Sequence, residues 1–204
     1  MLNTYTGHHK QGLILKYIVP ALGLTPEKDE LLIDELHLHS RLHTIIKSQF
    51  LETPGDWGDG HIWFSIDAMV HSYYTCQDTH ENCGRQIWKK QEFILDSQSF
   101  YDRQYRSDYI QAIEPGTFIS IPYPELNSLD EHFQPIKQHL IQLSRVQQRY
   151  SRHHVQLLNK PPLKKVGSFI SMHQLFARVA SNTINGMHTG LSRQGYEMQL
   201  KKLK

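Results

Sequence analysis

The spacing of apolar residues changes twice along this chain, and these changes limit its fold more than any other feature. Between about residues 45 and 121 the spacing is two, as in the run Ile-Trp-Phe-Ser-Ile at residues 62–66, which is typical of short strands. Turn sequences such as Pro-Gly-Asp at 54–56 and Glu-Pro-Gly at 114–116 separate the strand-like segments. Several short strands with such turns predict an antiparallel barrel or jelly roll. We therefore expect an α+β chain in which helices flank an antiparallel β-roll.

Helical spacing precedes the strands, over residues 11–51. A first apolar stripe ends at Pro20 and Gly23. Thr25 and Pro26 then have the residue types of an N-cap and a first helical position, so a second helix is predicted to start there. His39 and His43 lie one turn apart on this segment and could share a metal ion, but the spacing supplies no third ligand, so we expect no metal site.

Several classes of protein are disfavoured. The chain has no apolar run long enough to cross a bilayer and no signal peptide at its start, so we expect a cytoplasmic protein without a membrane partner. Cys76 and Cys83, the only cysteines, could face each other across a hairpin, but reduced thiols are the expectation there, and two thiolates are too few for a usual iron–sulfur site. The chain lacks a phosphate loop, a nucleophile elbow and a paired-histidine metal motif, so we expect neither an enzyme nor a cofactor.

Helical spacing returns from about residue 127 to 160, where Pro161 and Pro162 end it. An amphipathic helix packed on its own core would show such a stripe. Because the stripe extends over roughly four heptads between two modules, it predicts a dimer coiled coil instead. The residues close to its a and d positions are Phe133, Ile136, Leu140, Leu143, Tyr150 and Leu157.

Charge is distributed unevenly along the chain. From residue 141 onward eleven Lys and Arg face one acid, Glu197, whereas the first 140 residues carry 11 basic and 19 acidic side chains. This asymmetry indicates an acidic front module and a back module suited to a polyanion, although a solvated basic helix would also be basic.

The last residues predict a short helix that follows a turn at Gly190. Ser192 has the residue type of an N-cap, and Tyr196, Leu200 and Leu203 form an apolar stripe for packing on a core. A further helix is predicted over residues 168–179, with residues 164–167 as a basic connector and residues 181–189 as the helix before the turn. A helix that buries one side and offers Arg and Gln in its first turn is suited to the DNA major groove.

This C-terminal pattern, from Gly190 through Ser192, Arg193 and Gln194 to Leu203, resembles the recognition helix of the CRP/FNR family of bacterial transcription regulators. The resemblance extends in family order over roughly residues 45–204, through the Pro-Gly-Asp turn and the aromatic strands. It implies a sensor domain at residues 1–128, a dimerisation helix at 129–160 and a helix-turn-helix domain at 161–204. The partners it implies are DNA and a second copy of the chain, and it leaves RNA polymerase and an unknown small ligand open. The DNA-contacting residues it implies are Ser192, Arg193, Gln194, Met198, Lys201 and Lys202.

The resemblance also identifies a candidate ligand pocket, at Leu95, Asp96, Arg106 and Ser107. Arg106 and Ser107 keep the residue types that bind the phosphate of a cyclic nucleotide in relatives. Leu95 stands where glycine lets the backbone approach the ligand, Asp96 is one methylene short of the ribose carboxylate, and Asp108 adds negative charge beside the expected phosphate. We therefore expect the pocket to be empty or to hold a different ligand.

A second hypothesis is a dimeric sensor or interaction protein whose helix-turn-helix has decayed. Thr189 stands where the family usually has an apolar residue, Asn185 and Gly186 are poor helix formers, and Gly195 lies inside the last helix. A third hypothesis, an active cyclic-nucleotide sensor, predicts thermal stabilisation by such a ligand.

Overall fold

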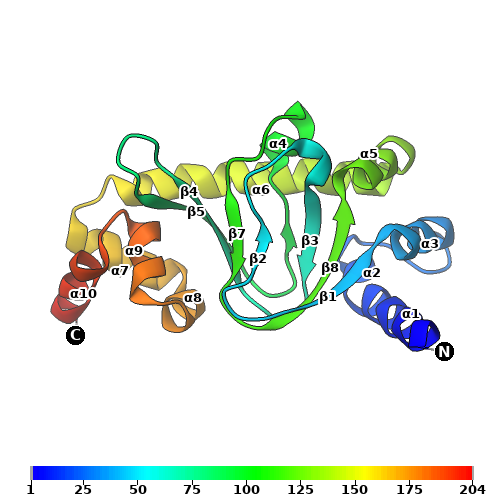
Figure 1. The fold of residues 1–204 in the computed structure, drawn as a ribbon, viewed down its shortest axis with the longest axis horizontal. Coiled ribbons are helices and arrows are strands. Elements are labelled where there is room, and N and C mark those ends of the chain that lie inside the picture. Colours follow the sequence, from blue (N-terminus) through cyan, green and yellow to red (C-terminus); the bar gives the residue numbers. More distant parts are fainter. Residues whose placement is uncertain (1, 204) are drawn as a thin grey trace.

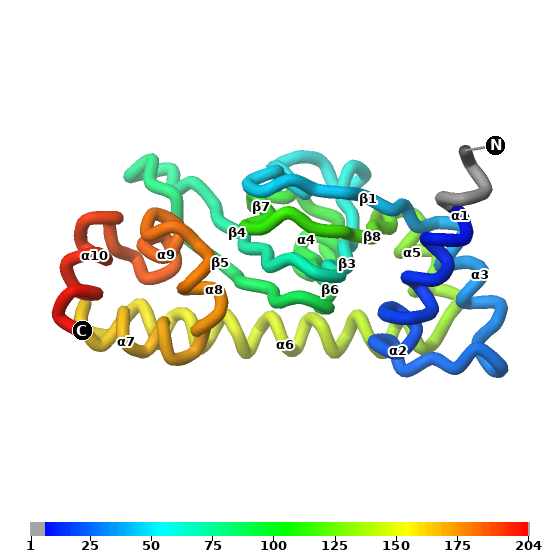
Figure 2. The backbone as a smooth tube through the Cα atoms, turned by 90° about the horizontal axis from the view of Figure 1, so that it is seen from below, coloured from blue at the N-terminus to red at the C-terminus, as the bar shows by residue number. Residues whose placement is uncertain are grey.

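The computed structural model describes the backbone of residues 2–203 and the side chains from Gly7 onward. Along the chain it contains a helical N-terminal segment, a β-roll, one long helix and a unit of four shorter helices (Figure 1). The long helix runs along one side of the molecule, with the N-terminal helices at one end and the C-terminal helices at the other (Figure 2). It therefore connects all the other parts.

The β-roll consists of two four-stranded sheets with the orders β1-β8-β3-β6 and β2-β7-β4-β5. Every strand pairing in them is antiparallel, which confirms the predicted jelly roll. The strands are β1 (Arg41–Ile45), β2 (Phe50–Glu52), β3 (His61–Ser65), β4 (Val70–Thr75), β5 (Asn82–Trp88), β6 (Phe93–Ile94), β7 (Tyr109–Ala112) and β8 (Gly116–Pro122).

The two-residue spacing of β3 serves two separate cores. Trp63 packs between the sheets in a cluster with Val70, Trp88 and Phe118. Ile62 and Phe64 point to the other side, where the N-terminal helices and the long helix cover them. Both faces of β3 are therefore buried, because helices cover the outer face of its sheet.

The N-terminal helices are α1 (Leu2–Leu13), the π-helical turn η1 (Ile14–Ile18), α2 (Val19–Ala21) and α3 (Glu30–His39). Two expectations are corrected here. Thr25 does not cap a helix, because α3 begins only at Glu30, with Asp29 at the N-cap position. Thr25 lies in the turn before it, where its N–H donates to the Asp29 carboxylate (2.8 Å). Helix also ends at His39 rather than continuing to residue 51, because the next residues pair with β8 as β1.

The predicted helix over residues 127–160 is two helices, α5 (Tyr123–His132) and α6 (Gln134–Leu158). Phe133 between them is extended, and Pro135 occupies the first turn of α6, where a missing N–H is tolerated. Two short helical pieces lie within the β-roll, η2 (Trp57–Asp59) and α4 (Ser97–Asp102).

The C-terminal helical unit consists of α7 (Pro162–Met172), α8 (Gln174–Val179), α9 (Asn182–Thr189) and α10 (Arg193–Lys202). Residues 164–167 are therefore part of a helix and not a connector. The helix expected over residues 168–179 is interrupted at His173, which lies outside helical geometry and caps both α7 and α8.

Candidate functional site

Helices α9 and α10 form a tightly capped helix-turn-helix. Ser181 Oγ accepts the N–H of Ile184 at the start of α9 (3.3 Å), and Ser192 Oγ accepts the N–H of Gly195 at the start of α10 (3.1 Å). Gly190 ends α9 with φ +61°, a left-handed conformation that favours glycine. Ser192 and Gly190 therefore have the cap and turn roles predicted for them, and Ser181 is a further N-cap.

Three of the four residues that suggested decay of this motif stabilise it. A Cβ at Gly186 would lie 2.6 Å from the carbonyl oxygen of Leu191, so the turn can approach α9 only at glycine. Asn185 is buried and donates to the carbonyl oxygens of Ala177 (3.0 Å) and Ala180 (3.4 Å). The buried hydroxyl of Thr189 donates to the Asn185 carbonyl (2.9 Å). Asn185 and Thr189 donate hydrogen bonds to backbone carbonyl groups, and Gly186 leaves room for the backbone of the turn. An apolar side chain could do neither.

The outer face of α10 is free for a partner. Arg193 pairs with Glu197 (Nε–Oε1 2.9 Å), but its side chain remains 68% exposed, and Met198 is 53% exposed. Tyr196 and Gln199 of α10 are buried. Leu203, expected in the same stripe as Tyr196, follows the end of the helix and is exposed. The residues predicted to contact DNA, all of them exposed, are Ser192, Arg193, Gln194, Met198, Lys201 and Lys202.

The C-terminal helical unit is docked on the β-roll through histidines. The ring of His188 in α9 lies against Gly84 of β5, where an added Cβ would approach its Nδ1 to 2.5 Å. Nε2 of His188 is 3.2 Å from Nδ1 of His71 on β4, and Nε2 of His154 on α6 donates to the His188 carbonyl (2.9 Å). The contact requires the space that a glycine leaves at position 84, and no sequence pattern indicated it.

Burial keeps this cluster neutral. It lowers the pKa of His71 to about 4, against a weaker opposing effect of the Gln111 side chain. It also lowers the pKa of His173 to about 4, with a further contribution from Lys89. The pKa values of His188 and His154 are lowered by burial as well. Neutral imidazoles therefore hold the two parts of the molecule together.

A cleft of about 430 Å³ lies between the β-roll and α6. Leu95 and Asp96, two of the predicted pocket residues, line it together with Trp88, Asp108 and the α6 side chain Gln147. Its volume is within the range of small-molecule sites.

Arg106 and Ser107, the other two candidate pocket residues, do not line this cleft, so the four candidates are not brought together in one pocket. The Arg106 guanidinium is buried in an ion pair with Glu52 of β2 and also donates to the Asp56 carbonyl (3.2 Å). Ser107 is exposed, and its hydroxyl donates to Asp108 (3.0 Å). Arg106 turns away because a buried carboxylate, 54 residues earlier in the chain, binds it.

The apolar stripe of α6 is also used differently from the prediction. Ile136 and Leu140 are buried against the outer side of the β-roll and the N-terminal helices, and Leu157 is buried in the C-terminal unit. Phe133, Leu143 and Tyr150 are partly buried beside them. These six residues therefore pack within the chain and do not form a free seam. The side of α6 that remains exposed carries Ile141, Val155 and Leu158 instead.

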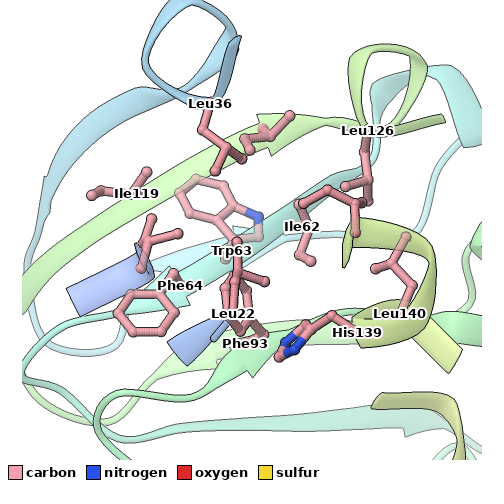
Figure 3. Close-up of a pocket in the computed structure, with 13 residues that line it drawn as sticks. Leu22, Leu36, Ile62, Trp63, Phe64, Phe93, Ile119, Leu126, His139 and Leu140 are labelled. Carbon is pink, nitrogen blue, oxygen red and sulfur yellow. The ribbon is translucent and has the colours of Figure 1, made fainter. Parts of the chain in front are cut away.

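A second cavity, shown in Figure 3, lies inside the core beside His139 of α6. Its volume of about 20 Å³ is enough for about one water molecule, and its other lining residues are apolar. Nε2 of His139 has no partner in the described part of the chain, and burial lowers its pKa. This cavity belongs to the core and is too small for a ligand.

The remaining candidates form no site. Among the described residues no group of three or more His, Cys, Asp or Glu side chains could hold a metal ion, and Cys76 and Cys83 are free. His39 pairs with Glu35 (3.1 Å), whereas His43 contacts the hydroxyl of Ser120 (2.8 Å). Within residues 2–203, no helix has the length and apolarity to span a membrane.

Solved structures share this fold, although no family model and no curated protein matches the chain. The c-di-GMP-responsive global regulator CLP of Xanthomonas campestris matches with a TM-score of 0.68 at 16% identity, over 86% of this chain and 91% of that one. FixK2 of Bradyrhizobium japonicum matches with 0.65 at 15%, over 80% and 84%. A CRP/FNR-family regulator of Thermus thermophilus matches with 0.60 at 12%, over 80% and 85%.

At these identities the likeness concerns the fold. The chain has the fold of CRP/FNR-type regulators over most of its length, including the β-roll, the long helix and the C-terminal helices. The resemblance found in the sequence is confirmed at that level. These neighbours are transcription regulators and not enzymes.

Proposed function

We propose that this protein, which has the fold of CRP/FNR-type regulators, is a DNA-binding transcription regulator. One observation carries the proposal: a capped helix-turn-helix offers an exposed helix face with Arg193, Gln194, Lys201 and Lys202 and no unpaired acid among its described residues. The proposed units are a sensor at residues 1–128, a connecting helix at 129–160 and a DNA-binding unit at 161–204. The basic balance of the last of these favours contact with a polyanion.

The side chains of α10 have different roles in this proposal. Arg193 contacts a guanine edge and Gln194 a neighbouring base, while Ser192 and the two lysines contact the backbone phosphates. Arg193 is available for this, because its i,i+4 pair with Glu197 is exposed to water, which weakens an ion pair. Met198 adds apolar contact or none.

Selection from a random pool of DNA duplexes at two salt concentrations tests this function. We expect an enriched palindrome with half-sites about one helical turn apart and a steep decrease of affinity with salt. Replacing Arg193 by Ala should weaken binding to the selected site by about 1–3 kcal/mol. The matched control is Arg41→Ala, which removes an exposed arginine from the β-roll. Binding without an enriched motif, or an Arg193→Ala variant as tight as wild type, would contradict the assignment.

We also propose that two copies pair through the exposed side of α6. Ile141, Gln148 and Val155 recur every seven residues on that side, and Ser144, Ser151 and Leu158 follow each of them by three. This is the a and d spacing of a two-helix seam in a different phase from the buried stripe. Small serines at the d positions allow close approach.

The oligomeric state of two charge-inserting variants tests the pairing. Val155→Asp places a carboxylate in the proposed seam, so we expect monomers by light scattering. Val146→Asp is the control, because Val146 is similarly exposed on α6 but lies outside the heptad positions. Equal dimer populations in the two variants would exclude this seam.

A further inference from the structure

The cleft between the β-roll and α6 has walls of a particular chemistry. Its charged lining residues are three carboxylates, Asp96, Asp102 and Asp108, and one cation, Arg85. The formal charge of the lining is therefore −2. A cleft with this charge attracts cations and repels phosphates.

Two backbone donors at the start of α4 that an anion could use are already bonded within the protein. The N–H of Ser97 donates to Oε1 of Gln147 on α6 (3.2 Å), and the N–H of Ser99 donates to Asp96 (3.2 Å). The hydroxyl of Ser97 also donates to Gln147, whose amide in turn donates to the Leu95 carbonyl. The N–H groups of Ser97 and Ser99 at the start of α4 are therefore already bonded to side chains of the protein itself.

The single cation of the cleft is also committed. Nε of Arg85 lies 3.3 Å from Asp108, and its guanidinium covers the ring of Tyr74 at 4.9 Å. Burial nevertheless raises the pKa of Asp108, against the opposing effect of Arg85. Arg85 thus compensates this carboxyl only in part. In the same wall the Ser72 hydroxyl is buried beside Asp108 and helps Arg85 to oppose the rise of that pKa, although it has no partner in full hydrogen-bonding geometry among the described residues.

Aromatic side chains complete the walls. Trp88, Tyr101 and Tyr150 all line the cleft, and Tyr101 lies at its exposed rim beside Asp102. An aromatic face attracts a cation through its quadrupole, and the attraction grows when the cation is removed from water. Carboxylates and aromatic rings that lie side by side can bind an organic ammonium ion, the first through charge and the second through the ring face.

We propose that this cleft binds a small organic cation, an amine or a quaternary ammonium compound. Its charge is held by Asp102 and Asp108, its apolar part contacts Trp88, and its remaining donors bind Ser72. The proposal rests on the proposed function, because the bound cation is then the signal to which the regulator responds. Because Gln147 of α6 lines the cleft, the ligand contacts the helix that leads to the C-terminal unit.

Calorimetric titration of the full-length protein without DNA tests this proposal. The probes are choline, putrescine and agmatine, with cyclic AMP as an anion, at about 0.15 M salt, which screens surface charges. We expect at least one of the cations to bind with Kd below about 1 mM and cyclic AMP not to bind. Asp102→Asn should weaken that binding about tenfold or more, whereas Asp34→Asn, which neutralises an exposed acid on α3, should leave it unchanged.

The outcomes separate the possibilities. Binding of cyclic AMP more tightly than every cation, or no binding of any cation up to about 10 mM by a folded protein, would overturn the proposal. Equal affinity of the Asp102→Asn and Asp34→Asn variants would also overturn it, because the cation would then bind elsewhere. DNA selection is measured without any of these compounds. A failure of DNA recognition therefore leaves this titration interpretable, and the reverse is also true.

Discussion

Acid should weaken the fold through the buried histidines between the β-roll and the C-terminal helical unit. His71 is fully buried, and its pKa is lowered to about 4 in the folded protein from an ordinary value of 6.5. As the pH falls below about 6.5, the unfolded chain binds a proton at this imidazole while the folded chain does not. The free energy of unfolding therefore decreases from about pH 6.5 down to about pH 4 and is unaffected by His71 above that range.

The size of the effect follows from the two pKa values. For His71 alone the free energy of unfolding should fall by about 2 kcal/mol between about pH 7.5 and about pH 5. His173, His154 and His188 change it in the same direction, because the pKa of each is lowered by burial. A loss of this size is a substantial part of the stability of an ordinary domain.

Urea denaturation at the two pH values, followed by circular dichroism, measures this loss. His71→Phe keeps an aromatic ring in the contact with Tyr73 and Phe176 but cannot be protonated. Although the variant is expected to be less stable at neutral pH, its loss on acidification should be about 2 kcal/mol smaller than that of wild type. His153→Gln, at an exposed position of α6, should keep the wild-type loss. An unchanged pH dependence in His71→Phe would refute the reasoning.

Two further substitutions test contacts that the sequence did not predict. Gly84→Ala should lower the melting temperature and expose the chain after α6 to proteolysis, because the added Cβ would lie 2.5 Å from the His188 ring. The control Gly58→Ala should be neutral, because no atom lies within 4 Å of its added Cβ. Glu52→Ala should reduce the free energy of unfolding by about 3–5 kcal/mol in urea titrations, since it leaves the buried Arg106 guanidinium unpaired; a loss below about 1 kcal/mol would show that the ion pair is not needed.

Local patterns predicted what depends on neighbouring residues. The two-residue spacing indicated β3, β4, β5, β6 and β8 but not β1, β2 or β7. Ser192 and Gly190 identified the cap and turn before α10, because each of these signals acts within a few residues. The stripe on α6 predicted an amphipathic helix correctly but not its partner, because spacing does not say which surface covers Ile136 and Leu140.

Features that depend on distant residues could not be predicted. Arg106 is turned away from the cleft by Glu52, which lies on another strand. Asn185 and Gly186 are poor helix formers by residue type, whereas the carbonyl groups around them that favour these residues are not visible in the sequence. Tertiary contacts decided each of these cases.

The apolar cluster of the C-terminal helical unit has a consequence for how the protein folds. Val166, Phe169, Phe176 and Tyr196 do not close a core by themselves, because Met69, Ile87 and Ile113 of the β-roll and Leu157 of α6 complete it. A fragment that begins at residue 161 lacks those partners and would expose the apolar faces of its helices to water. The last forty-odd residues thus depend on the β-roll and α6 for their own cohesion, and the chain should fold cooperatively, as one unit.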